Sequence, residues 1–327
     1  MTDSLRACPR SDGPGGARRR RRRVLTGVLA VGLTVAAACG QGPPRPTPPA
    51  LGSLGPCGRT NAQLTSNTAN AIYVAYPTGA AATPNLGGTC GDSARPVVFV
   101  VHGYLANSNI LYEGIIDHFT RAGNIVVMAT YGSGNLADVP GSANIEVAAI
   151  DAAVPQLDRE DMSKVGLIGH SLGGGMLPFV TQQVASRGWG GSALWLFSLA
   201  PYQGIGTGTI ALPAHTRAVV EAYSDDGLVN RSVGVDLFHR MSMPNSQKDH
   251  VTVRTSSLGG VTLSAAHTSP NSIIAPDDAI KFFGIYRVGD IVESCAVTGQ
   301  HCSDDMGFMG TWSDGTAVLP SVVSDNP

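Results

Sequence analysis

Ser171 stands in a setting that can turn a hydroxyl group into a nucleophile. It lies in Gly169-His170-Ser171-Leu172-Gly173, between the apolar run 164–168 and an expected helix at 176–187. A Gly-x-Ser-x-Gly turn between a strand and a helix holds its serine at a sharp, strained bend, and the two glycines remove side chains that would collide there. The alternative is a glycine-rich turn with an ordinary serine. The flanking strand and helix favour the nucleophile.

A serine nucleophile needs a base, and His267 is our candidate among the eight histidines. It follows the last expected strand and precedes the last expected helix, and active groups collect in loops beyond the carboxyl ends of parallel strands. His250 opens that strand at the opposite edge of the sheet, and His102 belongs to a His-Gly turn. The alternative for His267 is a solvated loop histidine.

An acid that orients the base is expected in the segment 224–229, directly after the strand 217–223. The order Ser, Asp, His along the chain is typical of serine hydrolases built on a parallel sheet. Asp226 begins an Asp-x-x-Val turn and is preferred to Asp225, although spacing alone leaves both open. We expect Asp225 to cap the turn.

Two backbone N–H groups should stabilise the oxyanion that forms during acyl transfer. One belongs to Leu172, the residue after the nucleophile, and the other to the loop after the strand 96–101. In that loop we favour the N–H of Tyr104, whose ring we also expect to line the substrate pocket. The alternative is that Tyr104 only packs over the turn.

The elements that position these residues alternate along the chain. Several expected strands are apolar throughout, as in parallel strands that are covered on both faces. Strands are expected at 72–76, 96–101, 124–129, 164–168, 193–199, 217–223 and 250–255, and helices at 112–122, 145–157, 176–187 and 277–286. This alternation predicts an α/β fold with a doubly wound, mostly parallel sheet. The glycines and proline in 200–216 argue against a large helical lid.

The N-terminal segment 1–39 has the features of an export signal. The basic run Arg18–Arg23 precedes an apolar stretch that is shorter than the about 20 residues of a membrane span. Cys39 after three alanines resembles a bacterial lipoprotein processing site, so membrane anchoring through a lipidated Cys39 and plain secretion both stay open. We expect a Pro- and Gly-rich linker at 40–56, a catalytic domain at 57–290 and a disulfide-stapled tail at 291–327.

Charge excludes one class of partner. Residues before Cys39 hold eight of the 22 Lys and Arg and two of the 24 acidic residues, so the remainder has a formal net charge of −8. Such a chain is a poor candidate for nucleic-acid binding, which depends on Lys and Arg. We expect a monomer that acts on a small-molecule or polymeric substrate.

Four cysteines remain after the signal, an even number that fits an oxidising environment. They allow three pairings, of which we favour Cys57 with Cys90 and Cys295 with Cys302, because each pair closes a local loop. Cys295, Cys302 and nearby His301 could instead bind a metal, but no second ligand pair with zinc-like spacing accompanies them. We therefore expect neither a metal nor a cofactor.

The motifs together resemble the α/β-hydrolase superfamily, in particular secreted actinobacterial-type esterases related to cutinase-like polyester hydrolases and dienelactone hydrolases. The likeness covers about 96–286 and rests on four motifs: 102–104 (HGY), 169–175 (GHSLGGG), 226–229 (DGLV) and 266–270 (AHTSP). It implies the triad Ser171, Asp226 and His267, with Tyr104 and Leu172 as oxyanion donors. The polyester hydrolases usually have Met where this chain has Leu172, and Trp where it has Tyr202, which we expect to contact substrate.

The resemblance implies hydrolysis of short to medium acyl esters or polyesters through an acyl-enzyme. A serine peptidase or another acyl-transfer enzyme would use the same residues, and assays on amide and ester substrates separate these classes. A non-catalytic surface binding protein with the same fold is the remaining alternative. It is weakened by the presence of all three triad members in order.

Overall fold

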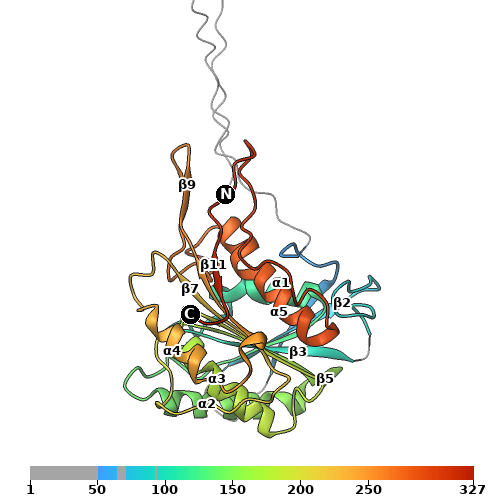
Figure 1. The fold of residues 1–327 in the computed structure, drawn as a ribbon. Coiled ribbons are helices and arrows are strands. Elements are labelled where there is room, and N and C mark those ends of the chain that lie inside the picture. Colours follow the sequence, from blue (N-terminus) through green and yellow to red (C-terminus); the bar gives the residue numbers. More distant parts are fainter. Residues whose placement is uncertain (1–50, 65–70, 93) are drawn as a thin grey trace, which may run out of the picture. The chain divides into compact units, whose positions relative to one another are not determined.

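The computed structural model describes residues 51–64, 71–92 and 94–327 of the protein (Figure 1). The predicted export signal, Cys39 and the predicted linker up to residue 50 lie outside the described residues. Those that are described belong to one compact unit. Among them, no helix has both the length and the apolar character that crossing a membrane requires.

A nine-stranded sheet forms the centre of this unit. Its strands are β1 (Gly58–Leu64), β2 (Ile72–Thr78), β3 (Arg95–Val101), β4 (Ile125–Ala129), β5 (Glu160–His170), β6 (Ala193–Leu199), β7 (Arg217–Tyr223), β8 (Lys248–Val253) and β11 (Val322–Ser324). They lie in the order β1-β2-β4-β3-β5-β6-β7-β8-β11. The six strands from β4 to β8 run parallel, whereas β1, β2 and β11 pair antiparallel with their neighbours. The predicted α/β fold with a mostly parallel sheet is confirmed.

Helices cover both faces of the sheet (Figure 1). On one face lie α2 (Val139–Ala153), α3 (Leu172–Ser186) and α4 (Ser232–Arg240), and on the other lie α1 (Glu113–Ala122) and α5 (Arg287–Thr298). Shorter elements are the 3-10 helices η1 (Asn109–Tyr112), η2 (Val154–Gln156) and η3 (Asn245–Gln247), the π-helix η4 (Ile280–Tyr286) and the hairpin of β9 (Ser256–Leu258) with β10 (Val261–Leu263).

The apolar strands are buried because each faces a helical layer on both sides. In β3, Val97 and Phe99 pack in the core beneath α2 and α3, while Val98 and Val100 pack in the core beneath α1 and α5. All seven residues of β3 and of β6 are buried. Each fully buried apolar side chain of this size contributes about 1.5–3 kcal/mol to folding. The continuous apolar runs in the sequence therefore report burial on both faces of the sheet.

The C-terminal region differs from the prediction of an aperiodic tail at 291–327. Helix α5 runs continuously across the predicted boundary after residue 290, and its residues Val288, Ile291 and Val292 pack against the sheet. Strand β11 then extends the sheet beside β8. The glycine and acidic residues of α5 mask its apolar face in the sequence, so this regular structure becomes evident only against the sheet.

Two other boundaries also moved. Helix α2 begins six residues earlier than the predicted helix at 145–157, because Asp138 accepts a hydrogen bond from the Gly141 N–H and Pro140 fits the first helical turn. Part of the predicted linker is packed: Gly52 is buried and its N–H donates to Asp290 Oδ2 at 2.6 Å. Residues 51–56 thus belong to the folded unit.

Two disulfides join the pairs that the sequence favoured. Cys57 is bonded to Cys90, and Cys295 to Cys302. The first ties the start of β1 to the loop before β3, and the second closes the end of α5. Because the sulfur atoms of Cys295 and Cys302 are bonded to each other, the alternative of a metal site at these two thiolates is excluded. The disulfides also indicate an oxidising environment.

Glu146 is a fully buried acid on the sheet-facing side of α2. Both carboxyl oxygens lack a hydrogen-bond partner among the described residues. Burial raises the pKa of Glu146 well above its usual value, because an isolated carboxylate is poorly solvated in an apolar interior. The folded protein therefore holds Glu146 in its neutral, protonated form.

The change Glu146→Gln is expected to preserve the fold and to weaken the pH dependence of its stability. Unfolding lets Glu146 release its proton above the ordinary carboxyl pKa, so this residue makes the free energy of unfolding fall as pH rises. Glutamine has no proton to release on unfolding. The slope of the unfolding free energy against pH should therefore become less steep by up to about 1.4 kcal/mol per pH unit. Urea unfolding at pH 5.5 and 7.5 measures the slope, with Glu160→Gln on β5 as the control. An unchanged slope would mean that folded Glu146 is ionised.

Candidate active site

Ser171 occupies a strained bend between β5 and α3. Its backbone has φ 56° and ψ −115°, a conformation that costs energy for a residue with a side chain. The bend lets α3 start against the end of β3, where a Cβ on Gly173 would collide with Val101 O and His102 O. A Cβ on Gly169 would lie 2.6 Å from Gly173 O. Both glycines are therefore required by close backbone approach.

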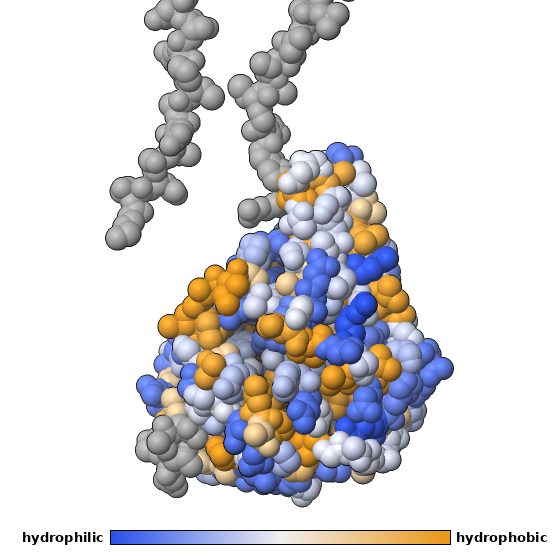
Figure 2. Space-filling view, turned by 90° about the vertical axis from the view of Figure 1, so that its left-hand side faces the viewer, coloured by the Kyte–Doolittle hydropathy of each residue, from blue (hydrophilic) through white to orange (hydrophobic). Residues whose placement is uncertain are grey.

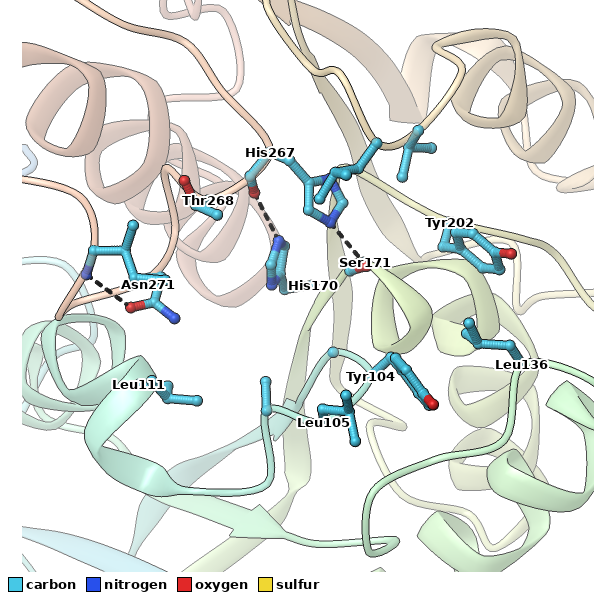
Figure 3. Close-up of a pocket in the computed structure, with 15 residues that line it drawn as sticks. Tyr104, Leu105, Leu111, Leu136, His170, Ser171, Tyr202, His267, Thr268 and Asn271 are labelled. Atoms are coloured by element: carbon cyan, nitrogen blue, oxygen red, sulfur yellow. Dashed lines mark hydrogen bonds between the residues drawn. The ribbon is translucent and has the colours of Figure 1, made fainter.

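The structure brings Ser171, His267 and Asp226 together in one hydrogen-bonded series. The distance from His267 Nε2 to Ser171 Oγ is 2.9 Å (Figure 3). The distance from His267 Nδ1 to Asp226 Oδ2 is 2.8 Å. The side chains of His267 and Asp226 are 10% and 3% exposed, so bulk water competes little for these bonds. With Asp226 accepting the Nδ1 proton, the Nε2 lone pair faces the serine hydroxyl.

Asp226 and its neighbour Asp225 have separate partners. Asp226 Oδ1 accepts the N–H groups of Leu228 and Val229 at 2.8 and 2.9 Å, which leaves Oδ2 for His267. Asp225 Oδ2 instead accepts from Thr255 Oγ1 at 2.7 Å. The expectation that Asp225 caps the turn was wrong, because Asp226 itself accepts the N–H groups of the turn.

Two backbone N–H groups near Ser171 are available to an oxyanion. Leu172 is the first residue of α3, and the first N–H groups of a helix have no partner within it. In the loop after β3, the N–H groups of Gly103, Leu105 and Ala106 all donate to oxygen atoms. The N–H of Tyr104 is engaged by none of the described residues, and Tyr104 lines the same cavity as Ser171, so this N–H can serve as a donor to an oxyanion.

The remaining histidines have other partners or lie elsewhere. His102 stacks on Tyr131, and burial lowers its pKa to about 4. His118, on α1, has its Nε2 atom 2.8 Å from Asp290 Oδ1 of α5. His250, on β8, lies next to Gly234 of α4. Over the whole described chain, no group of three or more His, Cys, Asp or Glu side chains is arranged to hold a metal ion.

A cavity of about 450 Å³ opens beside Ser171. Tyr104, Leu136 and Tyr202 lie on one side of Ser171, and Leu111, Thr268 and Asn271 lie on the other (Figure 3). The lining also includes exposed apolar side chains, namely Leu105, Leu228 and Ile274. Such a cavity favours an apolar substrate with few polar groups. On the face shown in Figure 2, apolar residues form patches between polar ones.

Several lining residues were not predicted from the sequence. Tyr104 and Tyr202 were expected at the substrate, and both line the cavity. Leu136 comes from a loop that carries no motif, and Asn271 directly follows the 266–270 motif without being part of it. Asn271 Oδ1 accepts the N–H groups of Ile273 and Ile274. No sequence signal pointed to them, because their position depends on the packing of loops that are distant in the chain.

Comparison with protein-family models finds no match for this chain. Curated proteins give no match either. The roles of Ser171, His267 and Asp226 therefore rest on their geometry and chemistry.

The contacts of the two aspartates predict different effects on the reactivity of Ser171. Asp226→Asn should slow phosphonylation of Ser171 by a fluorophosphonate about 10³- to 10⁴-fold, because the amide no longer holds the reactive tautomer of His267. Asp225→Asn is the matched control and should change this rate by less than about threefold. Mass spectrometry of the labelled protein gives both rates. The reverse ranking would reassign the acid to Asp225.

Proposed function

We propose that this protein is an extracytoplasmic serine hydrolase that cleaves carboxylic esters through an acyl-enzyme. One observation carries the proposal: the series from Asp226 through His267 to Ser171, with 2.8 and 2.9 Å contacts, opens into an apolar cavity. A buried carboxylate, an imidazole and a serine at a strained turn form the arrangement that activates a hydroxyl group for acyl transfer.

In the proposed reaction, Ser171 Oγ attacks the ester carbonyl carbon while His267 Nε2 takes the hydroxyl proton. Asp226 holds the imidazole and balances its positive charge. The N–H groups of Tyr104 and Leu172 stabilise the negative charge on the carbonyl oxygen. The protonated His267 then gives its proton to the leaving alcohol. Water repeats the sequence on the acyl-enzyme and releases the acid.

The size of the cavity suits short to medium acyl esters. The exposed apolar residues at its rim, Leu105, Leu228 and Ile274, could contact longer or polymeric esters. In the segment 200–216 between β6 and β7, the structure contains no helix that could cover Ser171. A substrate would therefore reach the site without opening of a helical lid. We place the enzyme in the α/β-hydrolase superfamily, on the order of its motifs along a mostly parallel sheet.

The proposed location is outside the cytoplasm, as a secreted or lipid-anchored protein. Its support comes from the two disulfides and from the signal-like residues 1–39. Mass spectrometry of Cys39 in the producing cell distinguishes acylation from plain cleavage.

Ser171→Ala is expected to lower hydrolysis of p-nitrophenyl butyrate by at least about 1,000-fold while leaving the melting temperature unchanged within about 3 °C. The hydroxyl forms the covalent bond to the acyl group, so no neighbouring residue replaces it. Ser186→Ala, at the exposed end of α3, is the control and should retain full turnover. Retained turnover in Ser171→Ala would refute the proposed function. Faster hydrolysis of matched amides than esters would indicate a peptidase.

Activity on tributyrin should rise smoothly through the solubility limit of this substrate. The reason is that no helical lid in 200–216 has to open at an interface. Titration of initial rates against tributyrin concentration, below and above saturation, tests this expectation. A sharp increase at the limit would show that another segment covers the site in solution.

A further inference from the structure

A chain of three buried hydrogen bonds runs behind Ser171. The Gly103 N–H donates to Tyr112 Oη at 2.8 Å, Tyr112 Oη lies 3.0 Å from His170 Nδ1, and His170 Nε2 lies 2.9 Å from His267 O. Tyr112 is 1% exposed and His170 is 8% exposed. None of these side-chain atoms belongs to the proposed triad or to the oxyanion donors.

In each of these three hydrogen bonds, the identity of the atoms decides which one donates the proton. The His267 carbonyl can only accept, so His170 Nε2 carries the proton and Nδ1 is an acceptor. Tyr112 must therefore donate its hydroxyl proton to Nδ1, while its oxygen accepts the Gly103 N–H. Every donor and acceptor in the chain is thus satisfied in a single arrangement. Any other arrangement would leave a buried polar group unpaired, at a cost of about 1–3 kcal/mol.

The two ends of this chain are the two segments that must meet over Ser171. Gly103 precedes Tyr104, whose N–H has no partner among the described residues, and the other end is the backbone of His267. We propose that Tyr112 and His170 are positioning residues that fix the distance between the Tyr104 N–H and the imidazole of His267. This inference rests on the proposed hydrolase function.

His170 is suited to this role because it stays neutral. Burial, together with the adjacent His267, lowers the pKa of His170 to about 3. The chain therefore keeps its direction when His267 becomes positively charged during turnover. A protonated His170 would donate its Nδ1–H to Tyr112 Oη, and the hydroxyl proton of Tyr112 would lose its acceptor.

The same two loops are also joined further from Ser171. The Ser272 N–H donates to Leu111 O at 2.7 Å, and the Gly114 N–H donates to Ser272 Oγ at 2.7 Å. These bonds should keep the two segments connected and the fold intact when the inner hydrogen bonds are broken, but they lie too far from Ser171 to fix the Tyr104 N–H and the His267 ring within a fraction of an ångström. Loss of Tyr112 Oη is thus expected to displace the reacting groups while the fold is retained.

The test compares Tyr112→Phe with Tyr76→Phe. Tyr76 on β2 also accepts a backbone N–H through its hydroxyl, from Asp158 at 3.3 Å, but it lies in another part of the sheet. Tyr112→Phe should lower kcat for p-nitrophenyl butyrate about 10- to 100-fold, with KM changed by less than about twofold, because misplacing reacting groups by about 1 Å costs about this much. Tyr76→Phe should keep kcat within about twofold.

Variants of His170 give an independent readout. His170→Gln can still donate to His267 O and should retain more activity than His170→Phe, which loses both bonds. If Tyr112 and His170 act through the same series of hydrogen bonds, the Tyr112→Phe/His170→Phe double variant should have a kcat only slightly below that of the less active single variant. This comparison detects coupling that a general loss of stability would not produce.

Three results would overturn the inference. They are unchanged kcat in folded Tyr112→Phe, multiplication of the two single losses in the double variant, and equal activities of His170→Gln and His170→Phe. The last comparison decides the matter alone if Tyr112→Phe fails to fold. Failure of the hydrolase proposal is seen separately, as turnover that survives Ser171→Ala.

Discussion

The close approach of α3 to the end of β3 is the constraint on which the rest of the site depends. Gly173 lies against the carbonyl groups of Val101 and His102, and Ser171 is held at positive φ so that the chain can turn into the helix there. The strained backbone of Ser171 persists because the buried strands and helix on either side of it fix the path of the chain. This one contact places Ser171 beside the Tyr104 loop and at the positive end of a helix.

The parallel register of the sheet brings the other groups to the same edge. Val101 pairs with Gly169, His170 with Leu199, and Leu199 with Glu221, so β3, β5, β6 and β7 end at nearly the same level. Loops that leave these ends converge although they are far apart in sequence. Asp226 follows β7 and His267 follows the β9–β10 hairpin, and both reach Ser171 from this edge.

Buried polar groups give the site its order. Tyr112 and His170 satisfy each other and two backbone groups. Glu146 has no hydrogen-bond partner among the described residues and avoids only the larger cost of a buried charge, by remaining protonated. In an interior of low polarity, an unpaired group is expensive, so each satisfied bond excludes alternative arrangements. The proposed reaction requires such order, because it depends on two loops meeting over one hydroxyl group.

The sequence alone determined the fold class, the strands of the parallel sheet and the bend at Ser171, because these follow from local patterns of apolar residues and glycine. It also favoured His267, by chain order. Tertiary structure decided what neighbours in sequence could not: that Asp226 rather than Asp225 faces His267, and that Tyr112 bonds His170. It also showed that β11 extends the sheet and that α5 packs against it, in the region where a disulfide-stapled tail was expected. Such contacts join residues dozens of positions apart, and their energy exists only once the loops are packed together.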